Sequence, residues 1–397
     1  MQQHSKVEKT ASRSRKGRVL RRTVITLVVV VALAYAAVGW YVSGEIIDAL
    51  RVNHDPVEYD TGVLSVTGDE IVLVPSDESS VEPDRDAIMG LRWDGGYGQI
   101  GPTSSFEDGA ETRPFTLIDG SPPPVGNDVA DFDSFAVPND PSLLGLPFET
   151  VVYASPLGDL EGWYFPGEGS TWIIGVHGRG ADRTEFLRLV DATSDLGYPT
   201  LLIRYRNDED SPVTGDSLIL AGQEEWEDVD AAVEYARSLG AVDVVVAGMS
   251  MGGGLSLGYA LNGPPDVVRG LILEAPAADV REVVRLRSGE ALPIGGPVGD
   301  SILAVGRMVT SLRTGVDFDA IDYVDRANEL DVPVLLFHGA DDDTIPVAIG
   351  ENLAAARPDL VEFHLIEDAT HVRAWNEDPD EYARVVAAFL ERIGRSG

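Results

Sequence analysis

The 397-residue chain contains no cysteine. This absence excludes disulfide bonds, thiolate catalysis and cysteine-based metal sites, although it says little about the compartment. Lysine is also scarce: all three lysines precede residue 17, so every later basic side chain is an arginine. No internal repeat is visible in the sequence either.

Positive charge is scarce outside the first residues. The formal net charge is −36, and residues 1–22 carry +7, so the remaining 375 residues carry −43. An acidic body of this kind repels nucleic acid and anionic lipid headgroups, so we expect no nucleic-acid partner. The acidity itself is more typical of general solubility than of a specific function.

Long hydrophobic runs are limited to one, residues 23–42, which carries no charge. About 20 apolar residues are enough for one helix to cross a bilayer of roughly 30 Å. Trp40 and Tyr41 lie where interfacial aromatics belong, and the basic flank predicts a cytoplasmic N-terminus and an exported body. We therefore predict a basic cytoplasmic tail (1–22) and a single-pass anchor in the cell membrane (23–43). The alternatives are a signal peptide cleaved near Ala34-Tyr35-Ala36, for which the run is longer than usual, and, more remotely, a buried core helix.

Residues 44–147 differ in composition from the rest. Strand-like runs at 62–66 and 71–74 flank a turn at 67–69, and beyond Pro83 the segment is rich in Gly, Pro, Asp and Ser. We predict a β-containing extension with long loops. A disordered stalk is the alternative, but four aromatic residues argue against it (Trp93, Tyr97, Phe106 and Phe115).

From residue 148 to the C-terminus, apolar strands alternate with helical segments. This alternation predicts a mostly parallel sheet covered by helices on both faces. The expected strands are 148–153, 160–165, 172–176, 200–205, 242–246, 271–273, 333–337 and 361–366. Between about 277 and 329 the alternation is interrupted, which predicts a small helical cap over the strand ends.

The stretch VDVVVAGMSMGGG, residues 242–254, carries the strongest chemical signal. It is a G-x-S-x-G elbow with a strand before it and a helix-compatible segment after it. Such a turn strains the backbone of Ser250, so its neighbours must be small, a requirement that Gly248, Gly252 and Gly253 meet. The Met251 N–H, at the start of the helix, would point at the group that the serine attacks.

A serine hydroxyl needs a base, and the base needs a carboxylate. His371 is the candidate base because it follows the last predicted strand, whereas the other histidines lie before the hydrolase segment, at strand ends or inside a strand (His4, His54, His177, His338 and His364). The acid should lie on the loop after the preceding strand, where Asp341, Asp342 and Asp343 stand. The resulting order is Ser, Asp, His, as in α/β hydrolases.

From about residue 148 onward the sequence resembles an α/β-hydrolase-fold serine hydrolase, and within it membrane-anchored Bem46-like and prolyl-oligopeptidase-like bacterial enzymes. The segments that carry the resemblance are the elbow, HGADDDTIP (338–346), Ala369-Thr370-His371 with Trp375, and His177-Gly178-Arg179-Gly180. The resemblance implies the α/β-hydrolase fold, a catalytic set of Ser250, Asp342 and His371, and oxyanion donors at the Met251 and Arg179 N–H groups. Asp341 or Asp343 as the acid remains the alternative, and the resemblance does not cover the first 147 residues.

These features predict a serine hydrolase acting on carboxylic esters through an acyl-enzyme, with a small-molecule ester or acyl substrate and neither metal nor cofactor. Adjacent aspartates cannot all face one calcium ion, and no G-x-G-x-x-G register fits the elbow glycines. The rivals are a prolyl-oligopeptidase-type peptidase, weakened by the missing propeller, and a catalytically silent cell-surface binding protein.

Overall fold

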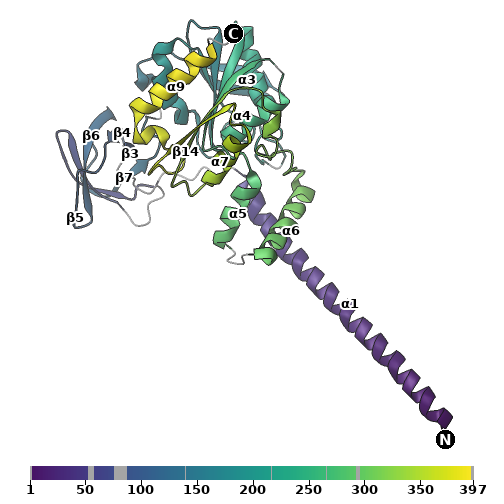
Figure 1. The fold of residues 1–397 in the computed structure, drawn as a ribbon. Coiled ribbons are helices and arrows are strands. Elements are labelled where there is room, and N and C mark those ends of the chain that lie inside the picture. The colour runs from purple at the N-terminus through teal and green to yellow at the C-terminus, as the bar shows by residue number, and fades with distance from the viewer. Residues whose placement is uncertain are drawn as a thin grey trace. The chain divides into compact units, whose positions relative to one another are not determined.

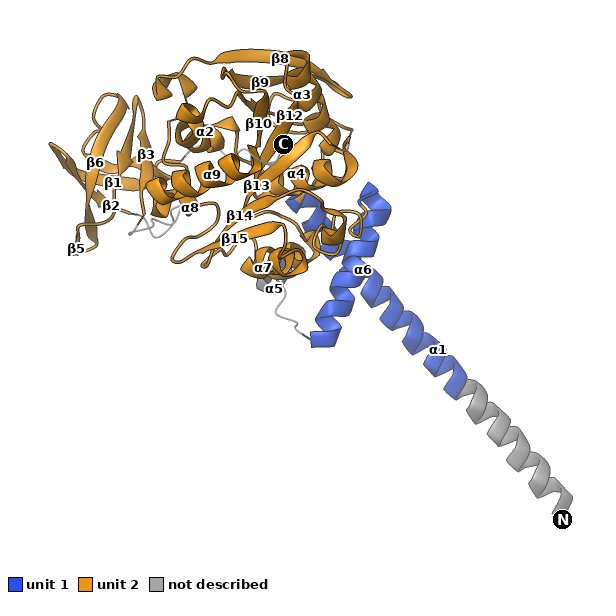
Figure 2. Cartoon of the chain, turned by 45° about the horizontal axis from the view of Figure 1, so that its top comes forward, with its two compact units in different colours: residues 1–49, 287–316 blue, residues 50–286, 317–397 orange. Residues whose placement is uncertain are grey.

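The computed structural model describes residues 2–51, 58–75, 87–138, 140–215, 217–264, 266–291 and 296–394. The chain forms two compact units, coloured separately in Figure 2. Unit 1 comprises residues 1–49 and 287–316, and unit 2 comprises residues 50–286 and 317–397. The predicted anchor and most of the predicted cap therefore belong to one unit.

Unit 1 is built on two helices, α1 (Gln2–Ala49) and α6 (Gly296–Thr314). The part of α1 from Leu20 to Ala49 is long and apolar enough to cross a membrane. The two helices pack closely because glycines remove side chains from their contact: a Cβ on Gly39 would lie 2.5 Å from Val305, and one on Gly306 would lie 2.4 Å from Val42. Figures 1 and 2 both show that α6 crosses α1 near the C-terminal end of α1.

Unit 2 begins with a small β-barrel. Its strands are β1 (Thr61–Thr67), β2 (Glu70–Val74), β3 (Met89–Trp93), β4 (Gly96–Ile100), β5 (Ser105–Glu107), β6 (Ala110–Gly120) and β7 (Gly126–Asp133). The order β2-β1-β7-β3-β4-β6 closes because β2 also pairs with β6, and β5 is attached to the edge of β6. Apolar side chains fill the interior (Val63, Ile71, Leu73, Met89, Leu91, Trp93, Ile100, Phe115, Ala130 and Phe132).

The barrel differs from the long loops that the sequence predicted for this segment. Two Asp-Gly pairs are the reason. Asp94-Gly95 joins β3 to β4, and Asp108-Gly109 joins β5 to β6, with φ of 53° at Asp108 and 81° at Gly109. Asp-Gly favours the positive φ values of a tight hairpin turn. The segment contains strands, as expected, and its two Asp-Gly pairs marked hairpin turns between them.

The remainder of unit 2 is an eight-stranded sheet of order β15-β14-β13-β12-β10-β11-β9-β8. Only β9 runs opposite to the other strands, because it pairs antiparallel with both β8 and β11, which confirms the predicted mostly parallel sheet and the α/β-hydrolase fold. The strands are β8 (Glu149–Ser155), β9 (Gly158–Phe165), β10 (Thr171–Val176), β11 (Thr200–Ile203), β12 (Asp243–Met249), β13 (Val268–Glu274), β14 (Val334–Gly339) and β15 (Val361–Ile366).

Helices cover both faces of this sheet (Figure 1). On one face α2 (Leu187–Thr193) and α9 (Pro379–Gly394) pack together, and on the other lie α3 (Trp226–Ser238) and α4 (Met251–Asn262). The other helices of the described chain are α5 (Val280–Ala291), α7 (Val347–Ala356), α8 (Ala374–Glu377) and the 3-10 turns Pro141–Leu144, Arg183–Phe186, Ser194–Leu196 and Ala327–Glu329.

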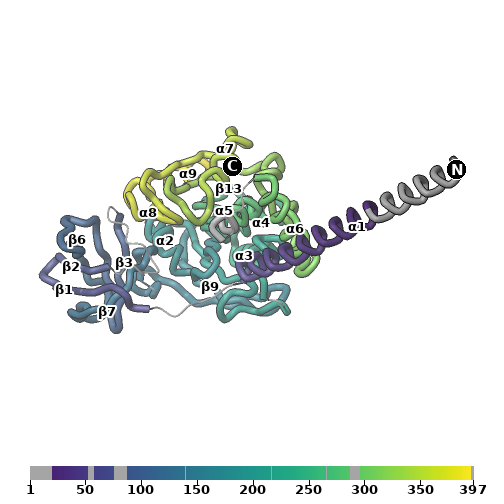
Figure 3. Tube along the Cα trace, turned by 90° about the horizontal axis from the view of Figure 1, so that it is seen from below, coloured from purple at the N-terminus to yellow at the C-terminus, as the bar shows by residue number. Residues whose placement is uncertain are grey.

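The barrel lies beside the end of the α/β domain that carries α2 and α8, as Figure 3 shows from below. Backbone hydrogen bonding joins them: the Ile88 N–H donates to the Asn376 carbonyl at 3.0 Å. The Asn376 side chain returns the contact by donating to the Ile88 carbonyl at 2.7 Å. The extension is thus attached to the segment that follows the last strand of the sheet.

Candidate active site

Ser250 lies at the corner between β12 and α4. Its φ of 53° and ψ of −119° place a residue with a Cβ in a region that side chains normally avoid. Two backbone hydrogen bonds hold the corner, from the Ser250 N–H to the Glu274 carbonyl and from the Ala277 N–H to the Ser250 carbonyl, both 2.9 Å. The hydroxyl therefore stands on a turn that its surroundings keep strained.

The glycines around Ser250 are required by close backbone approach. A Cβ on Gly252 would lie 1.9 Å from the Val176 carbonyl oxygen, and one on Gly253 would lie 2.6 Å from Pro276. At Gly248 a Cβ would lie 2.4 Å from the Gly252 carbonyl oxygen. Any larger residue at these three positions would push α4 away from the sheet, so the glycine pattern in the sequence has a direct steric cause.

The structure brings the three sequence-predicted side chains together. His371 Nε2 lies 2.9 Å from Ser250 Oγ, and His371 Nδ1 lies 2.8 Å from Asp342 Oδ2. Because a carboxylate only accepts, Nδ1 carries the ring proton and Nε2 offers its lone pair to the serine hydroxyl. This arrangement can move a proton from Oγ to the imidazole while the carboxylate stabilises the resulting cation.

Among the three consecutive aspartates, only Asp342 faces His371. Its side chain is fully buried, and Oδ1 accepts hydrogen bonds from the Thr344 and Ile345 N–H groups at 2.9 and 2.8 Å. Burial alone would raise the pKa of Asp342, but contacts with His338 and His371 outweigh it and hold the pKa below its usual range. Asp341 and Asp343, by contrast, are exposed.

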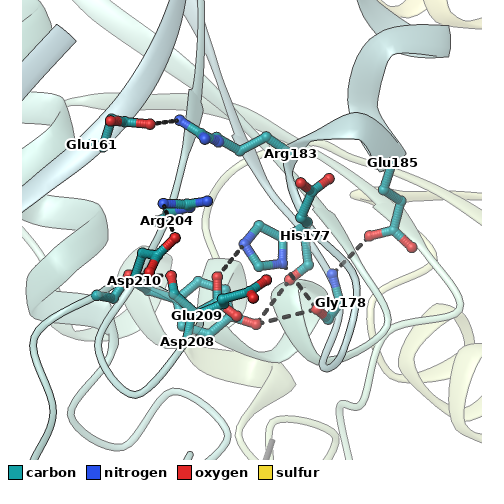
Figure 4. Close-up of polar contacts among 12 residues, drawn as sticks. Glu161, His177, Gly178, Arg183, Glu185, Arg204, Asp208, Glu209 and Asp210 are labelled. Carbon is teal, nitrogen blue, oxygen red and sulfur yellow. Dashed lines mark hydrogen bonds and ion pairs between the residues drawn. The ribbon is translucent and has the colours of Figure 1, made fainter. Parts of the chain in front are cut away.

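The loop after β10 lies against the nucleophile. A Cβ on Gly178 would lie 3.1 Å from the Cβ of Ser250, so only a small residue fits there. The Gly178 N–H donates to a carboxylate oxygen of Glu185 at 2.7 Å (Figure 4). The next residue is Arg179, and Met251 begins α4 on the other side of Ser250. Of the two backbone positions predicted to bind an oxyanion, Met251 thus directly follows the serine, and Arg179 directly follows the glycine that lies against it.

Buried polar contacts hold this loop in place. His177 Nε2 lies 3.1 Å from Asp208 Oδ2 (Figure 4). The His177 ring also stacks on Tyr205, with centroids 4.8 Å apart. The Tyr205 hydroxyl lies 3.3 Å from the carbonyl oxygens of His177 and Gly178. His177 thus has the structural position that its place at a strand end indicated. Burial raises the pKa of Glu185, although Arg188 and the Gly178 N–H partly offset this effect.

The histidine loop has its own supports, which the sequence did not reveal. Glu274 accepts a hydrogen bond from the Ala374 N–H at 2.8 Å, while its backbone carbonyl holds Ser250. Arg188, fully buried in α2, donates to the Val372 carbonyl at 3.0 Å, next to the candidate base. The role of Arg188 could have been predicted from the sequence, because an arginine inside the apolar run FLRLV (186–190) requires buried partners.

Among the described residues, no group of three or more His, Asp or Glu side chains is arranged to hold a metal ion. The chemistry that the site can perform with its own side chains is proton transfer coupled to attack by the serine hydroxyl.

Comparison with known proteins identifies the fold family. The model of the alpha/beta hydrolase family matches residues 173–385. An uncharacterized protein of Mycobacterium tuberculosis, Rv2307c, is 26% identical over 242 residues, 59% of this chain and 76% of the relative. YqkD of Bacillus subtilis, also uncharacterized, is 24% identical over 245 residues, 60% of this chain and 77% of the relative.

Among solved structures, the esterase Pf2001 of Pyrococcus furiosus superposes with a TM-score of 0.51 at 18% identity. The match covers 64% of this chain and 97% of the esterase. At this identity the likeness concerns the fold alone. Since the family model spans more than half of the chain, and the fold and the elbow agree with it, the chain belongs to the alpha/beta hydrolase family.

Proposed function

We propose that the protein is a serine hydrolase that cleaves carboxylic esters. The observation that carries the proposal is the contact chain from Ser250 Oγ through His371 to Asp342, with distances of 2.9 and 2.8 Å, on a strained elbow. Hydroxyl, imidazole and buried carboxylate in this order form the arrangement that activates a serine.

In the proposed reaction, His371 takes the proton of Ser250 while Oγ attacks the carbonyl carbon. The negative charge on the former carbonyl oxygen is stabilised by the N–H groups of Met251 and Arg179. Collapse of this tetrahedral intermediate expels the alcohol, which receives the proton from His371. Water, activated by the same imidazole, then releases the acid and restores the hydroxyl. Each oxyanion donor is worth on the order of 10²–10³ in rate.

The proposal places the enzyme on the membrane through α1, with the N-terminus in the cytoplasm and the hydrolase domain outside. The uncharged run of residues 23–42 and the basic residues before it support this topology. A kinship with membrane-anchored Bem46-like hydrolases remains part of the proposal.

A fluorophosphonate probe tests the nucleophile directly. We expect the full chain to be labelled and Ser250→Ala to remain unlabelled. Ser256→Ala is the matched control, because Ser256 is buried in the same helix and its hydroxyl is bonded to the Gly252 carbonyl. Labelling that persists in Ser250→Ala, or a folded wild type that never reacts, contradicts the proposal, and the second result favours a silent binding protein.

Substrate preference separates the ester hydrolase from the peptidase. We expect turnover of short-chain aryl esters to exceed that of aminoacyl anilides, and a series of ester chain lengths would define the acyl pocket. Faster cleavage of the anilides would reassign the enzyme to the peptidases.

A further inference from the structure

The helix α6 presents three different faces. Leu303, Gly306 and Thr310 are buried. Asp300, Arg307 and Ser311 lie together on a second, polar face, as the spacing of a helix requires. The third face is apolar and partly open: Val298, Met308 and Leu312 are 55%, 56% and 80% exposed. Ser301 and Val305, which the helical spacing places between them, contact α1. Three exposed apolar side chains on one face of a 19-residue helix indicate a partner that removes them from water.

Contacts within unit 1 show which part of α1 lies beside this helix. The Tyr35 hydroxyl and Ser301 Oγ are 3.1 Å apart, and the close approaches at Gly39 and Val42 lie in the same uncharged run. All three α1 residues belong to the stretch that is apolar enough to span a bilayer. The apolar face of α6 is thus continuous with a candidate membrane span.

The C-terminal end of α6 has contacts that are typical of residues at the level of the lipid headgroups. The Arg313 guanidinium lies 4.3 Å from the centre of the Trp40 ring and also donates to Ser43 Oγ at 2.9 Å. Trp40 and Tyr41 are 60% and 56% exposed. Tryptophan and tyrosine prefer the membrane–water interface, and arginine extends toward the headgroups from such positions.

We propose that α6 docks on the lipid bilayer, with its apolar face in the interface beside the anchor. Insertion is driven by burial of apolar surface and not by charge, because the part of the chain beyond residue 22 carries −43. The insertion between β13 and β14 is then a membrane-bound element of the enzyme, and unit 1 consists of one helix across the bilayer and one in its surface.

Single-cysteine labelling tests this placement, and the absence of native cysteine makes it direct. Met308→Cys and Leu312→Cys would carry an environment-sensitive fluorophore in the full chain, reconstituted in phosphatidylcholine–phosphatidylglycerol vesicles. Val242→Cys is the control, since Val242 is 68% exposed on unit 2. Each labelled protein must unfold at the same temperature as the wild type. If labelling at position 308 or 312 changes this temperature, Val298→Cys is used in place of that position.

We expect nitroxide-labelled lipids to quench the fluorophore at positions 308 and 312 at least about twofold, because an interfacial helix places its apolar face roughly 5–10 Å into the headgroup–acyl boundary. At position 242 we expect quenching by aqueous iodide only. The placement is overturned if the labels on α6 respond to iodide as position 242 does and ignore the lipid quencher.

The same placement indicates a substrate class, a step that rests on the proposed hydrolase function. Inside unit 2, the carbonyl of Arg51, two residues beyond the end of α1, accepts a hydrogen bond from the Arg179 guanidinium at 2.9 Å. Within unit 2, the first residues of the chain after α1 therefore contact the loop that follows β10. If α1 and α6 hold the enzyme on one bilayer, an ester dissolved in that bilayer meets it at a raised effective concentration. We infer that the substrate is such a lipophilic ester, taken from the bilayer that holds the enzyme.

A comparison of vesicles tests this step. A long-chain chromogenic ester is placed either in the vesicles that carry the enzyme or in separate vesicles, and a short, water-soluble ester serves as the control. We expect turnover of the long-chain ester to be at least about tenfold faster in shared vesicles, because confinement to one surface raises its effective concentration. Equal rates in both arrangements overturn the substrate class. Failure to cleave either ester contradicts the proposed function instead, and leaves the quenching result on α6 standing.

Discussion

Replacing Ser250 by glycine should stabilise the protein relative to alanine at the same position. With φ at 53° and ψ at −119°, any residue with a Cβ is strained there, at a cost of about 1–3 kcal/mol. Glycine removes this strain but loses about 1 kcal/mol through its greater freedom in the unfolded chain. We therefore expect Ser250→Gly to exceed Ser250→Ala in the free energy of unfolding by up to about 2 kcal/mol.

A matched pair in an ordinary helix isolates the strain. Glu351 is exposed in the middle of α7, and there glycine should be less stable than alanine by about 1 kcal/mol. We subtract the free energy of unfolding of the alanine variant from that of the glycine variant at each position, and this difference should be about 1–3 kcal/mol larger at 250 than at 351. In a domain of this size, each kcal/mol corresponds to roughly 2 °C of melting temperature.

The measurement is thermal unfolding of the full chain in detergent, followed by tryptophan fluorescence at one scan rate for all four variants. Both Ser250 variants lack the nucleophile, so loss of activity does not bias the comparison. If glycine is less stable than alanine by the same margin at both positions, the elbow is unstrained and the steric account of its glycines is wrong.

Three further predictions concern catalysis. Asp342→Asn should lower kcat on aryl esters by about 10³–10⁴. The amide oxygen would keep the Thr344 and Ile345 N–H donors, so the amide NH2 would face His371 and favour the wrong imidazole tautomer. Asp343→Asn, at an exposed position, should stay near wild type. As pH falls, kcat/KM should decline with the slope of a single proton, because His371 must be neutral to accept the serine proton. The lowered pKa of Asp342 keeps this carboxylate ionised at pH values below 3.8, the ordinary pKa of an aspartate. A two-proton slope would contradict this prediction. Glu185→Ala should lower kcat by about 10² with little change in KM, since the Gly178 N–H loses its acceptor and the loop proposed to bind the oxyanion shifts. Glu185→Gln keeps an acceptor oxygen and should recover most of the rate. Equal losses in both variants would assign the effect to the charge.

The α/β domain was readable from the sequence because its signals are local. A Val-rich strand, a glycine-flanked serine and a helix follow one another within 13 residues, and each element depends mainly on its own pattern. The position of Asp342 illustrates the limit of such reading. Three consecutive aspartates are equivalent by composition, and only the turn that gives Oδ1 two N–H donors decides which one turns inward.

The barrel and the packing of unit 1 depend on contacts between distant segments. Closure of the barrel requires β2 to pair with β6, about 40 residues later in the chain. The contact of α6 with α1 joins segments more than 260 residues apart, through glycines whose role appears only once both helices exist. Asp94-Gly95 was the local hairpin signal that could have identified part of the barrel in advance.

These long-range contacts give the extension a structural role at the active site. The Asn376 side chain donates to the carbonyls of Ile88, which precedes β3, and of Ser134, which follows β7. Its Oδ1 accepts from Arg188 at 3.0 Å, and the same guanidinium holds the Val372 carbonyl, one residue after His371. Because Arg188 is fully buried, its charge is costly unless these acceptors stay in place. The barrel therefore stabilises the loop that carries His371, which gives a structural reason for its attachment at this edge of the hydrolase domain.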